Sequence, residues 1–311
     1  MIKILLDTDT AGDDTTAMLL AMKSSRATLE AVTINCGNVS FDQEVENALY
    51  TIEVGGKSGK IPVYPGARHP LLRDWETAER VHGDDGMGNS RFPKAKQRPE
   101  TKNAVDAILE LVNSEPGEIT LVEIAPMTNL ALAIRKDPSI SKKVKHLYFM
   151  GGTNQYLGNV TPAAEFNIWV DPDAAAKVLA SGMKITIVPL DVTHRVLSTA
   201  ARVARLDRLG NRCAPYAARL IRAFDRPRVA RYGRRGRALH DPSAVAYLIA
   251  PELFRGREVS VMVETESELA RGMTIVDWWG VTGRPANARF LDRVDAGGVY
   301  DLLVEALARL P

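Results

Sequence analysis

Short runs of aliphatic and β-branched residues alternate with amphipathic stretches along most of this chain. The apolar runs predict strands at Ile2–Leu6, Leu29–Ile34, Ile119–Ile124, His146–Met150, Ile185–Pro189 and Val259–Val263. The amphipathic stretches predict helices at Asp13–Lys23, Asp42–Val54, Asn103–Asn113, Met127–Arg135, Asp171–Ala180, Ala214–Phe224, Asp241–Ile249 and Gly297–Leu310. Such alternation indicates an α/β fold, a Rossmann-like open and mainly parallel sheet with helices on both faces. The Gly-, Pro- and charge-rich stretch Ser58–Arg98 is expected to be mostly loop.

Polar clusters recur directly after the predicted strands. They occupy residues 7–14, 35–38, 151–167 and 190–191. In an open α/β sheet the carboxyl ends of the strands border the ligand crevice. We therefore expect these clusters to converge in space, although they are far apart in the sequence.

Four aspartates, Asp7, Asp9, Asp13 and Asp14, fall within the first of these clusters. So many like charges on one turn are costly unless a cation or protons offset them. Carboxylate ligands suit a hard cation such as Ca²⁺ or Mg²⁺. Any one of these acids could instead cap a turn or favour the positive end of a helix. All four together favour a metal site, because capping needs only one side chain.

The long segment 151–167 offers groups that suit a sugar. Asn159, Glu165 and Asn167 provide amide and carboxylate donors and acceptors for hydroxyl groups, and the segment contains no basic residue for a phosphate. Loops of this length are often functional. The alternative is an ordinary solvated loop with Asx turns.

Two histidines are candidates for the chemistry. His240 precedes Asp241 and Pro242, which read as an N-cap and a first helical residue. A histidine beside a carboxylate at a helix start is a candidate general acid. His82 opens the glycine-rich stretch 82–88, where a histidine reaches a ligand or, more commonly, lies exposed in a loop.

Composition narrows the class of protein. The 311 residues include 45% hydrophobic and 25% charged residues with a formal net charge of +2, which is ordinary for a globular protein and gives no general attraction to nucleic acid or membranes. No apolar stretch has the length of a membrane span, and the amino terminus lacks a signal-peptide layout. Cys36 and Cys213 form neither a metal-binding spacing nor a disulfide framework. We expect a cytoplasmic protein.

Taken in order, the polar clusters resemble the motifs of the inosine-uridine preferring nucleoside hydrolases. The matching segments are Asp7–Asp14, Gly37–Val39, His82–Gly88, Ala125–Asn129, Met150–Pro172, Pro189–His194 and Leu239–Pro242. The stretch from Met150 to Pro172 is nearly unbroken and is the most specific of them. The first turn differs, since Thr10 and Ala11 replace the family's Pro-Gly and Gly12 falls one position later.

The resemblance implies a single nucleoside hydrolase domain over residues 1–311 that cleaves the N-glycosidic bond of ribonucleosides with bound Ca²⁺. It implies that Asp9, Asp14, Asp241 and the Ile124 carbonyl bind the ion, and that Asp9 also accepts a proton from a metal-bound water. The ribose hydroxyls would contact a set of polar side chains, namely Asp13, Asn38, Asn159, Glu165 and Asn167. His240 would protonate the departing base and His82 would line the base pocket. The family also implies a homodimer or homotetramer.

Two other functions remain open from the residues alone. Asp7-Thr8-Asp9 fits the start of a haloacid-dehalogenase-type phosphatase motif, with Asp7 as nucleophile and Mg²⁺ as metal. The altered turn also allows a non-catalytic nucleoside-binding protein. Separately, the arginine-rich segment 226–237 suggests an anionic substrate such as a 5′-monophosphate, although a solvated surface or a subunit contact is the commoner reason for such a run.

Overall fold

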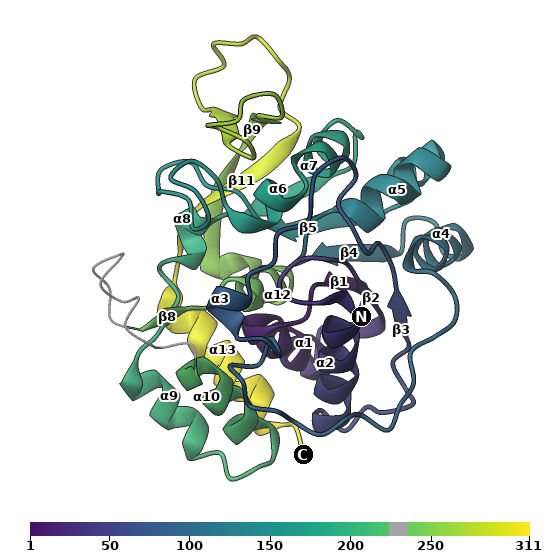
Figure 1. Ribbon diagram of the computed structural model, residues 1–311. Helices are drawn as coiled ribbons and strands as arrows, with labels where there is room; N and C mark the ends of the chain where they lie inside the picture. Colours follow the sequence, from purple (N-terminus) through teal and green to yellow (C-terminus); the bar gives the residue numbers. More distant parts are fainter. Residues whose placement is uncertain (224–235) are drawn as a thin grey trace.

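The computed structural model describes residues 1–223 and 236–311 and contains a nine-stranded sheet with helices against both faces (Figure 1). The strand order is β10-β9-β11-β6-β5-β4-β1-β2-β3. The strands are β1 (Ile2–Thr8), β2 (Ala27–Ile34), β3 (Val63–Pro65), β4 (Ile119–Glu123), β5 (His146–Met150), β6 (Ile185–Val188), β9 (Phe254–Val263), β10 (Thr274–Asp277) and β11 (Ala288–Val294). A separate two-stranded sheet pairs β7 (Leu197–Ser198) with β8 (Arg237–Ala238).

The sheet is parallel from β3 through β11, and β9 and β10 add an antiparallel edge. Successive residues of β1 point to opposite faces of the sheet, since Ile4 and Leu6 belong to one hydrophobic core and Leu5 belongs to the other. The mainly parallel α/β fold expected from the sequence is therefore confirmed.

The helices divide between these two cores. The longer helices of the first core are α1 (Gly12–Lys23), α2 (Phe41–Val54), α10 (Cys213–Ala223), α12 (Asp241–Ile249) and α13 (Ala296–Ala308). The second core is covered by α4 (Ala104–Ser114), α5 (Thr128–Lys136) and α7 (Pro172–Leu179). Shorter elements are α3 (Glu79–His82), α6 (Phe166–Val170), α8 (Leu190–Thr193), α9 (Ala200–Asp207) and the 3₁₀ turns at Pro138–Lys142 and Pro251–Leu253. None of the described helices combines the length and the apolar character needed to cross a membrane.

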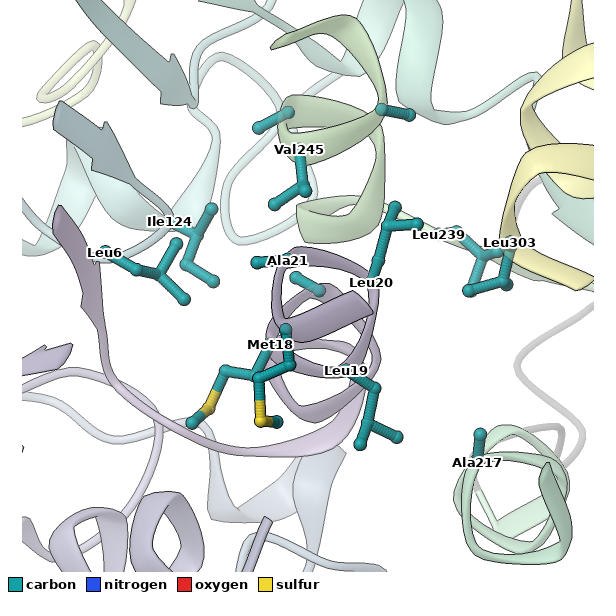
Figure 2. Close-up of a cluster of buried hydrophobic side chains, with 14 of the residues drawn as sticks. Leu6, Met18, Leu19, Leu20, Ala21, Ile124, Ala217, Leu239, Val245 and Leu303 are labelled. Carbon is teal, nitrogen blue, oxygen red and sulfur yellow. The ribbon is translucent and has the colours of Figure 1, made fainter. Parts of the chain in front are cut away.

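Helix α1 lies inside the molecule rather than on its surface. Every residue from Gly12 to Met22 is buried. Figure 2 shows α1 side chains packed between β1 and Ile124 on one side and Val245 of α12 on another, with Leu303 of α13 nearby. From Ala17 to Met22 the helix is apolar on all sides, as expected for a helix that the fold encloses. The acidic residues at its amino end are therefore held on a rigid, buried support.

The predicted elements are present, with boundaries shifted by a few residues. Strand β1 continues through Asp7 to Thr8, beyond the predicted end at Leu6, because hydrogen bonds satisfy the buried Asp7 carboxylate. The prediction missed the strands β7, β8, β10 and β11 and the helices α6, α8 and α9. In β11 the charged residues Arg289, Asp292 and Arg293 interrupt the apolar run. The stretch Ser58–Arg98 is mostly loop, as expected, and contains only the short elements β3 and α3.

Candidate active site

The polar clusters after five neighbouring strands meet at the carboxyl edge of the sheet. Asn38, after β2, donates from Nδ2 to the Asp9 carbonyl, after β1, at 3.2 Å. Asn167, beyond β5, donates from Nδ2 to the carbonyl of Ile124, after β4, at 3.3 Å. Asp191, after β6, accepts from two backbone N–H groups of the loop after β5, and the Ile124 N–H donates to the Asp7 carbonyl. These contacts confirm that the clusters converge, as expected for an open α/β sheet.

The turn between β1 and α1 accommodates its unusual residues. Ala11 has an extended backbone with φ of −139°, which any residue adopts, and the positive φ falls on Gly12 at +26°. Asp14 closes the turn, because its carboxylate accepts hydrogen bonds from Thr8 Oγ1 at 2.7 Å and from the Ala11 backbone N–H at 3.2 Å. The shifted glycine therefore supplies the turn without the Pro-Gly pair.

The Asp9 carboxylate is buried and neither of its oxygens has a hydrogen-bond partner among the described residues. A Cβ at Gly37 would lie 1.9 Å from Asp9 Oδ2, so only glycine allows this side chain its place. Burial, then the charges of Asp14 and Glu44, raise the pKa of Asp9 well above its ordinary value. A buried carboxylate without partners is a costly arrangement that a bound cation would relieve.

Asp13 joins the start of α1 to the start of α12. Its Oδ2 accepts hydrogen bonds from the backbone N–H groups of His240, at 2.8 Å, and Asp241, at 3.3 Å. Arg237 Nη2 lies 3.5 Å from Asp13 Oδ1. Burial acts to raise the pKa of Asp13, but the charges of Arg237, His240 and His82 together bring it below its ordinary value. Asp13 is thus the carboxylate of this cluster that favours the charged form.

The segment 151–167 is held in shape by its own polar side chains. Glu165 caps α6 by accepting from the N–H groups of Asn167 and Ile168, and it also accepts from Gly152 at 3.1 Å. Burial raises the pKa of Glu165 to about 7, against the effect of these backbone donors. Asn159 Oδ1 accepts from the Phe166 N–H at 2.9 Å. Part of this sugar-binding candidate set therefore also holds the loop in shape.

His240 is partly buried, and its ring contacts polar and aromatic neighbours. Nδ1 lies 2.8 Å from Thr193 Oγ1, and the His194 ring is 5.3 Å away in an edge-on arrangement. Burial lowers the pKa of His240 to about 4. His240, and not Asp241, is the N-cap position of α12, and Asp241 makes no side-chain cap, so the N-cap interpretation of Asp241 is wrong. The charges of Asp13, Asp14 and Asp9 act on the Asp241 carboxylate, which places it in the crevice.

His82 lies at the end of α3 and is 8% exposed, so it is not the exposed loop histidine that its surroundings in the sequence suggested. Its charge acts on Asp13, which places it near the carboxylate cluster.

Asp7 belongs to the sheet rather than to the crevice. Its carboxylate accepts hydrogen bonds from Asn129 Nδ2 at 2.8 Å, from Thr33 and from Asn35. Burial raises its pKa to about 6, and the hydrogen bonds oppose that rise. A carboxylate so engaged is poorly suited to attack a phosphate ester, which argues against Asp7 as the nucleophile of a phosphatase.

The oxygen atoms that could act as metal ligands at the crevice fit a hard divalent cation. Burial, followed by the charges of Asp13, Asp14 and Asp9, raises the pKa of Asp241 well above its ordinary value. The charged forms of these carboxylates therefore repel one another. All the donors are oxygens, as Ca²⁺ and Mg²⁺ require. Within residues 1–223 and 236–311, no three His, Cys, Asp or Glu side chains already form a group that could hold a metal ion. The carboxylates would have to draw together around a cation.

Three residues of the crevice were not identified as site residues from the sequence. Thr193 contacts His240, Arg237 contacts Asp13, and Gly37 makes room for Asp9. Arg237 is the described end of the arginine-rich segment, and positions 226–235 of that segment lie outside the described residues. No local pattern in the sequence pairs Thr193 with His240 or Arg237 with Asp13, so only the fold reveals these contacts.

Comparison with known proteins agrees with this geometry. The family model described as "Inosine-uridine preferring nucleoside hydrolase" matches residues 4–301. A pyrimidine-specific ribonucleoside hydrolase, RihA of Enterobacter sp. (strain 638), is 38% identical, with 99% of this chain and 98% of the relative covered. Two solved structures share the fold with a TM-score of 0.92. One is a plant nucleoside hydrolase, 32% identical with 99% of both chains covered, and the other is a purine-preferring ribonucleoside hydrolase from Gardnerella vaginalis, 30% identical with 98% of both chains covered.

These matches span nearly the whole chain and argue against the phosphatase alternative. The chain therefore belongs to the inosine-uridine preferring nucleoside hydrolases, enzymes that hydrolyse the N-glycosidic bond of ribonucleosides.

Proposed function

We propose that this chain, as one domain over residues 1–311, is a Ca²⁺-dependent ribonucleoside hydrolase that releases ribose and free base. The main support is the buried Asp9 carboxylate, which has no hydrogen-bond partner among the described residues and lies in a crevice with Asp14 and Asp241. Asp9, Asp14, Asp241 and the Ile124 carbonyl would hold the ion. Ca²⁺ is preferred to Mg²⁺ because it accepts six to eight oxygens in flexible geometry, so ribose hydroxyls can complete its shell.

The ion would supply positive charge that lowers the pKa of a water and orients the ribose. Asp9 would accept the proton of the water that attacks C1′. Asp13, Asn38, Asn159, Glu165 and Asn167 would bind the ribose hydroxyls. The transition state for glycosidic cleavage resembles an oxocarbenium ion, so the surrounding carboxylates stabilise the positive charge that develops on the sugar.

The histidines would act on the base. His240 would assist its departure, which matters because an unassisted base leaves as an anion, and such help is typically worth about 10²–10⁴ in rate. His82 would line the base pocket. Relatives named as pyrimidine-specific and as purine-preferring both match this chain, so uridine, cytidine and inosine are the first substrates to try.

The function is tested by measuring reducing sugar and free base over a panel of ribonucleosides, before and after chelation and with Ca²⁺ or Mg²⁺ restored. We expect turnover that a chelator abolishes and that Ca²⁺ restores better than Mg²⁺. Turnover that survives complete metal removal would contradict the role of the ion. Tight nucleoside binding without base release would instead identify a non-catalytic nucleoside-binding protein.

The same assay with 5′-nucleotides tests the arginine-rich segment. A 5′-monophosphate turned over faster than its nucleoside would support anion recognition by residues 226–237. If the 5′-monophosphate is turned over at the same rate as its nucleoside or more slowly, these residues would instead form a solvated surface or a subunit contact.

A further inference from the structure

We propose that Thr193 is a positioning residue for base departure. In this proposal its hydroxyl donates to Nδ1 of His240, which holds the ring in the tautomer that carries its hydrogen on Nε2. This inference rests on the proposed function, since the role of the Nε2–H group is to donate to the departing base. It adds to that function a residue that contacts neither the sugar nor the base.

The direction of the hydrogen bond follows from the partners of Thr193. Thr193 is fully buried, and its Oγ1 lies 2.8 Å from His240 Nδ1. Among the described residues, Nδ1 is the one hydrogen-bond partner of this hydroxyl. A buried hydroxyl seeks an acceptor for its proton, and Nδ1 of a neutral imidazole is an acceptor only when the hydrogen is on Nε2.

The two residues are held in this relation by backbone hydrogen bonds. The His240 N–H donates to Asp13 at 2.8 Å, and the Leu239 N–H donates to the Val196 carbonyl at 2.9 Å. Val196 is tied in turn to the carbonyl of Thr193 at 3.0 Å. These backbone hydrogen bonds therefore fix the position of Thr193 relative to the His240 ring.

The tautomer matters because it decides which group the neutral His240 ring offers the departing base at Nε2. A neutral imidazole has a single N–H group, and its partner on the other nitrogen decides where that hydrogen lies. A neutral histidine can act as an electrophile by donating this hydrogen bond, as the histidine of triosephosphate isomerase does. Without the Thr193 hydroxyl, His240 could place its hydrogen on Nδ1 and present a lone pair to the departing base.

Nitrogen-15 NMR of the histidine-labelled protein tests the tautomer directly. The chain has five histidines, and comparison with His240→Gln identifies the His240 signals. We expect the Nε2–H tautomer in the wild type and in Thr193→Ser, and a mixture of tautomers in Thr193→Val. A wild-type His240 with its hydrogen on Nδ1, or an unchanged ring in Thr193→Val, would overturn the inference whether or not the enzyme turns over.

Leaving-group dependence tests the consequence. The p-nitrophenolate of p-nitrophenyl β-ribofuranoside needs little help to depart, whereas a nucleobase does. For Thr193→Val we expect kcat on nucleosides to fall by about 10–10²-fold, less than the loss of general acid help as a whole. The fall on the p-nitrophenyl riboside should be at most about 3-fold, and Thr193→Ser should recover most of the nucleoside activity.

Equal losses on both substrates, with Thr193→Ser no better than Thr193→Val, would show a merely structural role and overturn the inference. Combining Thr193→Val with His240→Gln should cost little more than His240→Gln alone, because the hydroxyl acts through the ring. Failure of the proposed function has a different signature, in which the wild type releases neither base nor nitrophenol while the NMR result still decides the tautomer.

Discussion

At the scale of single residues, the site combines carboxylates that accept hydrogen bonds with Asp9, whose buried carboxylate accepts none among the described residues. Asp14 accepts hydrogen bonds from Thr8 and Ala11, and Asp13 accepts them from His240 and Asp241. Asp9 has none among the described residues. A group that opposes folding in the absence of its ligand is typical of a functional site, because the ligand then repays the cost of burial.

Asp9→Asn should therefore separate activity from stability. Loss of the proton acceptor and of a metal ligand should lower kcat by about 10²–10⁴-fold. Above the raised pKa of Asp9, the metal-free variant should nevertheless be as stable as the metal-free wild type or more so, by about 1 kcal/mol, because a buried carboxylate without partners is costly to ionise. Nucleoside turnover and thermal unfolding in chelator measure the two effects. Asp42→Asn, at an exposed surface pair with Arg68, is the control that should change neither. A strongly destabilised Asp9→Asn would mean that the carboxylate is structural.

At the scale of elements, the loop after β2 positions the loop after β1. Gly37 lies so close to Asp9 that a Cβ would reach Oδ2 at 1.9 Å, Cγ at 2.6 Å and the Asp9 Cβ at 2.7 Å. Atoms cannot approach this closely, and the backbone of both loops is fixed by neighbouring strands. A Cβ at position 37 would therefore displace the Asp9 side chain, which is the group proposed to accept the proton.

Gly37→Ala should reduce nucleoside turnover by at least about 10²-fold, since a displacement of about 1 Å at a reacting group costs that much. The affinity for Ca²⁺ should fall as well. Gly59→Ala is the matched control, because a Cβ there meets nothing within 4 Å while φ of +73° strains an alanine. That control should lose about 1 kcal/mol of stability and keep its activity. Full activity in Gly37→Ala would show that Asp9 tolerates displacement.

The sequence predicts the elements well and their contacts only in part. Apolar runs of five or more residues located the central strands, and polar residues that follow strands located the crevice. The strand order and the antiparallel edge depend on pairing between distant segments, which no local pattern encodes. The same limit applies to the site, since the meeting of Thr193 with His240 and of Arg237 with Asp13 depends on tertiary packing.

At the scale of the whole molecule, the antiparallel edge has an exposed apolar surface. Trp279 and Val281, in the loop after β10, are 87% and 84% exposed. Large exposed apolar groups often mark contacts between chains. A homodimer or homotetramer, which the resemblance to the family implies, would bury them.

Trp279→Ser combined with Val281→Ser should therefore lower the molar mass in solution from that of an assembly to that of the 34.0 kDa chain. Light scattering coupled to size-exclusion chromatography measures it. Leu72→Ser, at an apolar side chain of the stretch Ser58–Arg98 that is 77% exposed, is the control and should leave the mass unchanged. An assembly that survives the double substitution would place the contact on another face.

The crowded carboxylates also give the metal-free molecule a distinctive dependence on pH. Burial raises the pKa values of Asp14 and Glu165 to about 7, and those of Asp9 and Asp241 well above their ordinary range. A carboxyl group whose pKa is higher in the folded state contributes stability at pH values below its unfolded pKa near 4, and that contribution is lost as pH rises through the folded value. The lowered pKa of His240 acts in the opposite sense, but only below about pH 6.5.

Between pH 6.5 and 8 the carboxyl groups alone should therefore determine the slope. In chelator, the free energy of unfolding should fall by about 1 kcal/mol or more over that range. Saturating Ca²⁺ should remove most of this fall, because the ion favours the charged carboxylates and stabilises the folded state by binding it. Chemical denaturation at several pH values, with and without Ca²⁺, measures both slopes. A metal-free protein that becomes more stable toward pH 8, or a slope that Ca²⁺ leaves unchanged, would mean that these acids are balanced by the protein itself and not by a cation.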